Sequence, residues 1–289
     1  MPNGIVIVDK PEGWTSHDVV AKLRGVFHEK RIGHGGTLDP MATGVLPVFV
    51  GRATRAVEFF ESSEKEYVAG LRLGLTTDTE DTTGAALTES PVAVTAEQVG
   101  QAVADLCGEQ LQTPPMYSAV KVGGKKLYEL ARAGKTAERK PRAITVFQTE
   151  LLGGEGAEYT FRVRCSKGTY VRSLCRDLGQ ALGCGGCMSS LRRTAAGAYL
   201  DRDAVPLDEI IASDEPEKFL RPVDSMFPAA PPLYLGEREV KKVKNGADVP
   251  LAGLPAGQFR LYAPSGEFLA LAAYDGAALH TIKSFYEVN

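Results

Sequence analysis

The 289-residue sequence predicts an α+β protein: a mixed, mostly antiparallel sheet flanked by helices, followed by a small C-terminal β domain. Short apolar strands and amphipathic helices are interleaved up to about residue 228, without the regular rhythm of a parallel α/β fold. After the proline cluster 228–232, short alternating stretches are separated by glycines, which is typical of a small barrel or sandwich. We therefore expect two domains, 1–228 and 232–289.

The composition excludes several classes of protein. Apolar residues make up 44% and charged residues 24%, as in globular proteins that are soluble in water. No stretch approaches the roughly 18 apolar residues of a membrane span, and the N-terminal apolar run is too short for a signal peptide. Five cysteines, an odd number in a long chain, do not predict a disulfide framework. We expect a cytoplasmic protein with no membrane partner.

Apolar spacing and turn residues predict the elements of the first part of the chain. Ser16 is expected to be the N-cap of the first helix, and Thr95 and Gln98 form a capping box that opens another. The predicted elements are strands at 5–9, 45–50 and 66–73, helices at 17–28, 52–60 and 95–108, and a loop at 76–84.

A basic segment interrupts the run of strands. Residues of about 109–142 contain a Pro-Pro pair, a turn at 121–126 with two glycines, and a short helix at 127–133. We expect this segment to be an arm outside the core. After it, the pattern predicts strands at 144–152, 159–165 and 188–193, a helix at 171–182 closed by Gly183, and a helix at 207–212.

Charge is segregated along the chain although the net charge is only −3. The stretch 121–142 holds eight Lys or Arg and two Glu, 162–176 holds five and no acid, and 201–217 holds seven acids and one Arg. Such segregation can give an acidic protein a basic face that binds phosphates. The alternative is that each cluster is a set of solvated surface charges.

The candidate catalytic loop is Gly33–Pro40, Gly-His-Gly-Gly-Thr-Leu-Asp-Pro. Its three glycines and one proline disfavour a helix or strand, so the backbone is expected to hold His34 and Asp39 at fixed positions. An apolar run at 45–50 anchors the loop directly behind the carboxylate. A surface turn is the alternative reading.

This loop resembles the catalytic loop of the TruB family of tRNA pseudouridine synthases, G-H-T-G-T/A-L-D-P-x-A-x-G-x-L, with Gly35 where that family more often has Thr. Further stretches resemble the same family in the same order: 9–16, 65–84, 114–132, 166–179 and 191–193. The resemblance covers roughly residues 4–200 and returns faintly at Lys244-Asn-Gly246, which is similar to a PUA-like RNA-binding module.

The resemblance implies a pseudouridine synthase fold and the isomerisation of uridine 55 in the T-loop of tRNA, with base flipping and without a cofactor. One carboxylate suffices for this chemistry, and Asp39 is the match, as nucleophile or as general base at the sugar. Arg172 would be its partner, because a fixed guanidinium favours the charged carboxylate. Tyr170 would border the base near the C5 proton and is a candidate acceptor for it.

Other site residues follow from the same resemblance. Tyr67 would stack on the flipped base, Leu191 would complete the wall, and His34 would pack into the RNA loop. On pattern alone Tyr67, Tyr170 and Leu191 would be core residues, and a lone His34 would imply neither a ligand nor an acid/base group. The residues expected to contact the RNA backbone are Lys10, Lys121, Lys125, Lys126 and Arg132. No metal is expected, because no His, Cys or Asp cluster has ligand spacing, and Cys184 and Cys187 are best read as two loop thiols.

Two alternatives to a stand-alone enzyme remain. One is a non-catalytic RNA-binding or tRNA-folding factor, against which the set of Asp39, Tyr67, Tyr170 and Arg172 argues. The other is the guide-RNA-dependent relative that modifies ribosomal RNA in a complex, which carries longer terminal extensions. We expect a monomer whose partner is the T-stem-loop of tRNA and which requires no protein partner.

Overall fold

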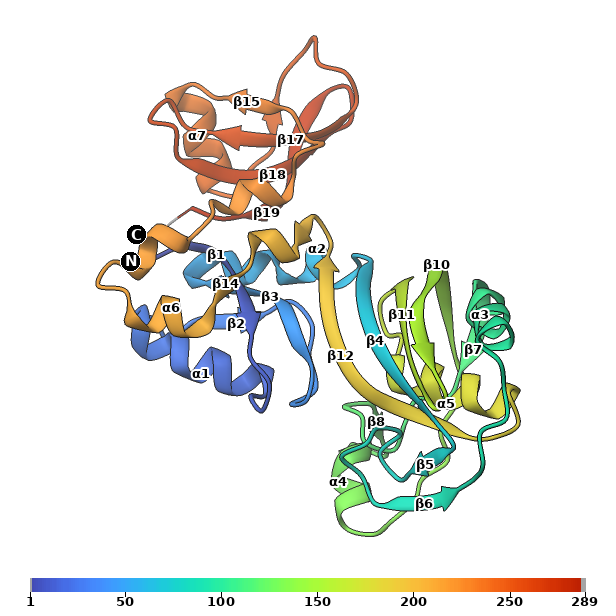
Figure 1. The fold of residues 1–289 in the computed structure, drawn as a ribbon. Coiled ribbons are helices and arrows are strands. Elements are labelled where there is room, and N and C mark those ends of the chain that lie inside the picture. The colour runs from blue at the N-terminus through green and yellow to red at the C-terminus, as the bar shows by residue number, and fades with distance from the viewer. Residues whose placement is uncertain (1, 287–289) are drawn as a thin grey trace.

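A computed structural model describes residues 2–286, in which a ten-stranded sheet and a five-stranded sheet lie in two connected parts of the molecule (Figure 1). The larger sheet has the strand order β14-β1-β3-β12-β4-β11-β10-β7, with β2 paired to β3 and β13 paired to β12. Its strands are β1 (Gly4–Lys10), β2 (Ile32–His34), β3 (Thr43–Val50), β4 (Lys65–Leu73), β7 (Gly108–Gln112), β10 (Arg142–Glu155), β11 (Glu158–Cys165), β12 (Gly186–Ala196), β13 (Tyr199–Leu200) and β14 (Val205–Pro206).

Only two pairs in this sheet, β1 with β14 and β3 with β12, are parallel among the described strands. The other neighbours run antiparallel, from β1 with β3 to β10 with β7. The predicted mixed, mostly antiparallel sheet is therefore confirmed.

Helices cover one face of this sheet. The main apolar core joins that face to α1 (Ser16–Val26), α3 (Ala96–Asp105), α5 (Val171–Ala181) and α6 (Leu207–Ala212). The predicted helix at 52–60 is instead a 3-10 turn, η1 (Gly51–Ala56), followed by α2 (Val57–Glu61). Further 3-10 turns are η2 (Asp201–Asp203), η3 (Pro216–Phe219) and η4 (Val223–Met226).

The N-cap of α1 is Thr15, not Ser16 as predicted. The Thr15 side chain accepts a hydrogen bond from the Asp18 backbone, and the Asp18 carboxylate accepts one from the Thr15 backbone, which completes a capping box. Ser16 is buried, and its hydroxyl accepts a hydrogen bond of 2.9 Å from the backbone N–H of Leu38. Thr and Ser are both common N-cap residues, so the sequence did not show which of Thr15 and Ser16 caps the helix. Only the Ser16 hydroxyl contacts the candidate loop.

Strands β1 and β3 bury both of their faces. Val6 and Val8 point into the main core, whereas Ile5 and Ile7 point to the opposite face and pack with Phe49 of β3 in a second core. Because side chains alternate along a strand, this placement requires apolar residues in succession rather than in alternation. The candidate loop between β2 and β3 is thus attached to a strand held on both sides.

The basic segment leaves the sheet after β7 and returns at β10, so the part outside the sheet runs from 113 to 141. It contains a two-stranded hairpin, β8 (Lys121–Val122) with β9 (Lys125–Lys126), followed by α4 (Leu127–Arg132). A second small hairpin, β5 (Leu75–Thr77) with β6 (Ala86–Glu89), follows β4 and occupies the start of the predicted 76–84 loop. Figure 1 shows both hairpins at the same end of the molecule.

The C-terminal part is a five-stranded sheet with one helix, α7 (Glu237–Lys244), which agrees with the predicted small β domain. Its strands are β15 (Pro232–Tyr234), β16 (Val249–Pro250), β17 (Gly257–Tyr262), β18 (Phe268–Tyr274) and β19 (Ala278–Ser284). It shares the second core with the larger sheet, because Leu271 and Phe285 pack in the same cluster as Ile5 and Phe49. The ring centroid of Phe227 lies 5.4 Å from that of Phe59 and 6.1 Å from that of Phe285.

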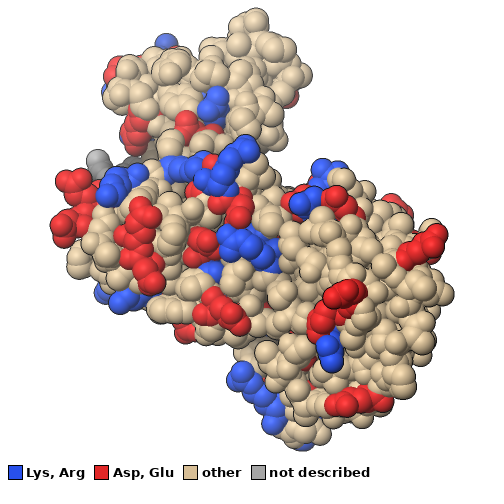
Figure 2. All heavy atoms as spheres, viewed as in Figure 1, with Lys and Arg blue, Asp and Glu red and all other residues tan. Residues whose placement is uncertain are grey.

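The charged side chains are spread over the visible face of the molecule, with one basic group at its lower end (Figure 2). Figure 2 shows Lys and Arg atoms at the lower end of the view, over the region of α4 and the β8–β9 hairpin, whereas acidic and basic atoms lie side by side on the left. No helix among residues 2–286 is both long and apolar enough to cross a membrane.

Candidate active site

Three side chains hold the loop that carries Asp39. The Ser16 hydroxyl binds Leu38, and the guanidinium of Arg193 donates to the carbonyl of Gly36 at 3.3 Å. The ammonium of Lys10 donates to the carbonyls of Pro11, Trp14 and Pro40 at 2.9, 2.6 and 3.3 Å. The backbone on both sides of Asp39 is therefore fixed by contacts from α1, β1 and β12.

Lys10 is not placed to contact an RNA backbone, contrary to our expectation. Its side chain is fully buried, and burial lowers its pKa from 10.5 to about 8 although Asp39 and Glu12 oppose the shift. All three ammonium donors have a carbonyl acceptor in the loop region. Lys10 is therefore a structural residue that joins β1 to the candidate loop.

Asp39 and Arg172 form a bidentate ion pair. Arg172 Nε lies 2.9 Å from Asp39 Oδ2, and Arg172 Nη2 donates to Asp39 Oδ1 at 3.2 Å. The side chain of Arg172 is 6% exposed and that of Asp39 is 35% exposed, so the guanidinium is buried and the carboxylate is accessible. A fixed guanidinium fork holds the carboxylate in one orientation and leaves its outer side free for a substrate.

Arg172 is itself held by residues that the sequence analysis did not single out. Its Nη1 and Nη2 donate to the carbonyls of Thr79 and Tyr117, each at 2.9 Å, and the buried carboxylate of Asp81 lies 3.8 Å from Nε. Asp81 is fixed in turn by the hydroxyls of Thr79 and Thr83. The acid-rich run 78–81 was the available signal, but only the fold shows which carboxylate faces the arginine.

Arg193 is a second buried arginine at this site, also missed as a site residue. It is 1% exposed, its Nε donates to the Val45 carbonyl at 2.7 Å, and its guanidinium interacts electrostatically with the Tyr67 side chain. Burial lowers the pKa of Arg193 and raises the pKa of Tyr67, so the phenol keeps its proton. One guanidinium therefore ties the candidate loop, β3 and Tyr67 together.

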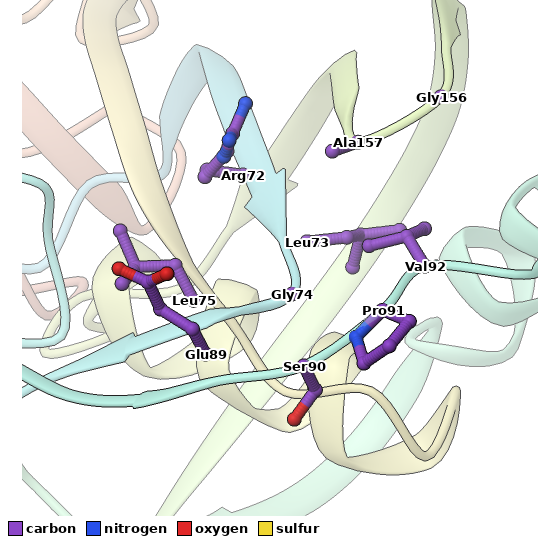
Figure 3. Close-up of a pocket in the computed structure, with 10 residues that line it drawn as sticks. All are labelled: Arg72, Leu73, Gly74, Leu75, Glu89, Ser90, Pro91, Val92, Gly156 and Ala157. Atoms are coloured by element: carbon purple, nitrogen blue, oxygen red, sulfur yellow. The ribbon is translucent and has the colours of Figure 1, made fainter.

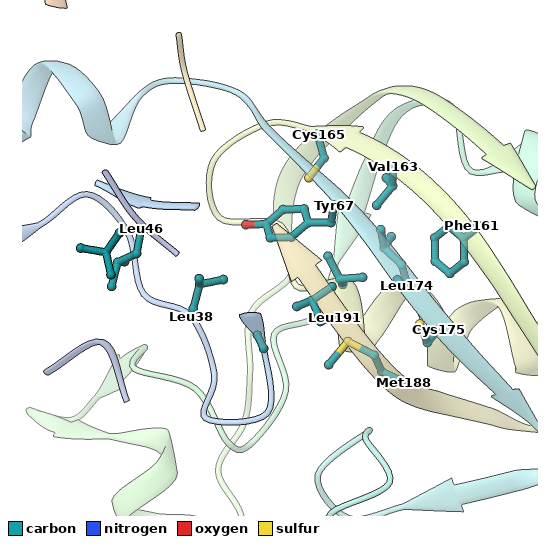
Figure 4. Packing of buried hydrophobic residues seen from close by; sticks show 14 of the residues in the cluster. Leu38, Leu46, Tyr67, Phe161, Val163, Cys165, Leu174, Cys175, Met188 and Leu191 are labelled. Atoms are coloured by element: carbon teal, nitrogen blue, oxygen red, sulfur yellow. The ribbon is translucent and has the colours of Figure 1, made fainter. Parts of the chain in front are cut away.

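Tyr67 and Leu191 lie on the neighbouring strands β4 and β12. Both are nearly buried and belong to the main core. Figure 4 shows the Tyr67 hydroxyl pointing toward the loop that carries Leu38, with Leu191 on the adjacent strand. The aromatic and the aliphatic residue are thus brought to the same side of the sheet as the candidate loop.

Tyr170 immediately precedes α5, two residues before Arg172. The buried Gln112 side chain at the end of β7 accepts from the Tyr170 N–H at 2.8 Å and donates to the Tyr170 carbonyl at 3.0 Å. This reciprocal pair fixes the start of α5 to the base of the basic segment. Nothing in the sequence distinguishes Gln112 from other polar strand residues.

His34 ends β2 and is half-buried beside the loop. Burial, with His17 and Arg193 nearby, lowers its pKa from 6.5 to about 4, so the imidazole is neutral at physiological pH. Its ring lies edge-on to that of His17, with centroids 5.3 Å apart, and its Nδ1 has no hydrogen-bond partner in the described part of the chain.

The expected RNA contacts on the basic segment differ in exposure. Lys121, Lys125 and Arg132 are exposed, whereas Lys126 is half-buried, with its ammonium 3.4 Å from the Tyr128 hydroxyl. The Tyr128 ring also lies 5.5 Å from the guanidinium of Arg132. The segment reaches the site through Tyr117, whose carbonyl binds Arg172.

Other features do not add to this site. A hollow of about 600 Å³ at the far end of β4 is lined by residues around Gly74, including Arg72, Glu89 and Gly156, but by none of the site residues (Figure 3). Cys184 and Cys187 are both free and buried, but Cys187 lies in β12 and not in a loop as expected, and burial raises its pKa to about 11. Within residues 2–286, no three His, Cys, Asp or Glu side chains gather as a metal site requires.

Comparisons with known proteins converge on one family. The family model described as TruB family pseudouridylate synthase (N terminal domain) matches residues 24–171, and that of the tRNA pseudouridylate synthase B C-terminal domain matches residues 172–228. A tRNA pseudouridine synthase B from Syntrophomonas wolfei is 44% identical over 277 residues, which is 93% of each chain. One from Ralstonia nicotianae is 42% identical over 96% of this chain and 92% of its own.

Solved structures support the same fold. A chain from the crystal structure of a Cbf5-Nop10-Gar1 complex has a TM-score of 0.73 and 30% identity, covering 98% of this chain and 85% of that one. A chain from an H/ACA RNP bound to a substrate RNA containing 2'-deoxyuridine has a TM-score of 0.72 and 27% identity, with the same coverage. The similarity extends through the C-terminal sheet, which is consistent with the PUA-like module expected there.

Proposed function

Because this chain belongs to the TruB family of pseudouridylate synthases and is an enzyme of tRNA pseudouridine formation, we propose that it isomerises uridine to pseudouridine at position 55 in the T-loop of tRNA. The observation that carries this proposal is the bidentate pair of Asp39 and Arg172, with its buried guanidinium and accessible carboxylate. A protein that only binds RNA has no need of such a pair.

The chemistry requires one carboxylate at the sugar. The N1–C1′ bond of uridine breaks, the base turns, and a C5–C1′ bond forms, while C5 loses a proton and N1 gains one, so no oxidant or energy source is consumed. Asp39 either attacks the sugar or removes a sugar proton, and both roles use the outer side of the carboxylate that Arg172 leaves free. Tyr170 borders the base and is the candidate acceptor of the C5 proton.

A uridine in the T-loop reaches this carboxylate only after it leaves its stack. In our proposal Tyr67 lies on the flipped base, Leu191 forms the opposite wall, and the neutral His34 packs into the space that the nucleotide vacates. The positions of Tyr67 and Leu191 on adjacent strands support this arrangement. The 113–141 segment then follows the T-stem backbone through Lys121, Lys125 and Arg132, which are exposed to solvent.

The enzyme is proposed to act alone, as a cytoplasmic monomer without a cofactor. The relatives that are 42–44% identical are named tRNA pseudouridine synthase B, whereas the chains from H/ACA particles are 27–30% identical. The second candidate, a subunit of a guide-RNA particle, is favoured only by this structural likeness. Incubation of the isolated chain with an unmodified tRNA transcript separates the two, because a particle subunit would need further components.

Asp39→Asn tests the proposal. Tritium release from [5-³H]uridine in tRNA is expected to fall by many orders of magnitude, while tRNA affinity stays within about tenfold, because phosphate contacts supply most of the binding. Asp105→Asn, on the exposed face of α3, is the matched control and should keep the wild-type rate. Turnover by Asp39→Asn would remove this carboxylate from the mechanism. If position 55 of tRNA stays modified in cells that lack the protein, the assigned substrate is wrong.

A further inference from the structure

At Gly35, in the candidate loop, neighbouring side chains leave no room for a Cβ atom, whereas the backbone conformation does not itself require glycine. Among the loop glycines, Gly36 has a positive φ of 99°, but Gly35 is not among the positive-φ residues of the described chain. A Cβ atom at Gly35 would lie 2.4 Å from Cδ1 and 2.7 Å from Cε1 of Phe60, and 3.1 Å from Phe49 Cε2. Even alanine would therefore have to displace an aromatic ring.

The Phe60 ring has little room to move aside. It is 4% exposed, and its centroid lies 5.9 Å from the rings of both Phe49 and Tyr199. On its far edge, a Cβ atom at Gly197 would lie 3.0 Å from Phe60 Cε2. The ring is thus held between the backbones of two glycines, and close packing of this kind transmits a displacement instead of absorbing it.

Contacts on other sides fix the same short piece of backbone. The Gly35 N–H donates to the Pro47 carbonyl at 2.8 Å, and Arg193 binds the carbonyl of the next residue, Gly36. Phe60 packs directly on the chain between these two contacts, four residues before Asp39. A shift of the ring therefore moves the chain at the point where the loop leaves β2.

We propose that Phe60, from α2, is a positioning residue for the candidate catalytic loop: it acts through the bare backbone of Gly35 to set the place of Asp39. Phe60 belongs to the second core, whereas Tyr67 and Leu191 belong to the main core, and the Phe60 ring fills the volume that a side chain at position 35 would need. The inference rests on the proposed function, because its main measurement is pseudouridine formation.

The test is a double-mutant cycle between Gly35→Ala and Phe60→Leu, which keeps an apolar side chain but removes the ring. The rate constant is measured in single turnover at saturating enzyme, tRNA affinity by filter binding, and the folded fraction by thermal unfolding. Gly35→Ala is expected to lower the rate constant at least tenfold with affinity changed less than threefold. In the double variant the methyl group enters the vacated space, so the rate constant should recover at least threefold over Gly35→Ala.

Two further variants calibrate the cycle. The methyl group of Gly33→Ala would meet only Thr54 Cγ2 at 3.9 Å, so its rate constant should fall less than that of Gly35→Ala. Gly25→Ala, on the exposed face of α1, should have the rate constant of the wild type.

If Gly35→Ala fails to fold, Phe60→Leu alone must lower the rate constant at least threefold without loss of tRNA affinity. A wild-type rate in Gly35→Ala or Phe60→Leu, or a double variant no faster than Gly35→Ala, overturns the inference; inactivity of the wild-type chain would instead overturn the proposed function.

Discussion

Replacement of Arg172 by lysine keeps the charge beside Asp39 but removes the guanidinium fork. The three nitrogen atoms of Arg172 make four polar contacts: an ion-pair contact of Nε with Asp39 Oδ2, and one hydrogen bond each to Asp39 Oδ1 and to the carbonyls of Thr79 and Tyr117. These acceptors lie around different edges of the fork. A lysine ammonium has three donors at a single point, so we expect Arg172→Lys to retain at most two of the four contacts.

The size of the effect follows from this count. A hydrogen bond to a charged group contributes about 1.5–3 kcal/mol, so two lost contacts correspond to about 3–6 kcal/mol. If half of this acts on the transition state, the rate falls about tenfold to 150-fold, at about 1.4 kcal/mol per factor of ten. Arg172→Met should lose more, because it also leaves the carboxylates of Asp39 and Asp81 without a cation between them.

The assay is single-turnover pseudouridine formation at saturating enzyme, expressed per folded molecule. Arg162→Lys, on β11 and paired with Glu150 at the surface, is the matched control and is expected to stay within threefold of the wild type. A rate for Arg172→Lys within twofold of the wild type would refute the reasoning, because it would mean that the fork geometry has no part in placing Asp39.

Three other predictions concern His34, Tyr67 and the basic segment. The pKa of His34 in the folded protein is about 4, below its ordinary 6.5, so the unfolded chain binds the proton more readily. The stability present above pH 6.5 is therefore lost as the pH falls toward 4. Urea unfolding should show a loss of up to roughly 3 kcal/mol in the free energy of unfolding of the wild type, and no such loss in His34→Gln. Tyr67→Leu should lose far more turnover than tRNA affinity, and equal losses would make Tyr67 a general folding or binding residue. Replacing Lys125 and Lys126 with Ala should flatten the log–log salt dependence of tRNA binding by about one unit, and at most about two, because Lys126 is half-buried against Tyr128; an unchanged slope would mean that the segment is a solvated loop.

Features set by local pattern were predictable from the sequence. The alternation and length of β4 and β11, the capping box at Thr95 and the helical spacing of α5 each follow from neighbours within a few residues. The candidate loop was also visible locally, because its glycines and proline punctuate the chain beside a strongly apolar strand.

Features that depend on distant residues were not predictable. Lys10 resembles a surface lysine in sequence, but its burial depends on Pro40 and on the turn through Trp14. Asp81 faces Arg172 only because α5 packs beside its loop, and Gln112 meets Tyr170 across 58 positions of sequence. A propensity scale describes each residue in isolation, whereas these contacts are made between elements.

The second core also sets the order in which the two parts of the protein can pack together during synthesis. It joins Ile5 and Ile7 near the start of the chain to Leu271 and Phe285 near its end, and it includes Phe60 beneath the candidate loop. On the ribosome this core stays open until the last strands emerge, because domains build their contacts as the chain appears. Most of the other buried members of this core, from Ile5 to Tyr199, belong to the larger sheet and the segments packed on it. Leu271 and Phe285 therefore join this core last, after Phe49, Phe60 and Tyr199, which lie around the candidate loop, have already emerged.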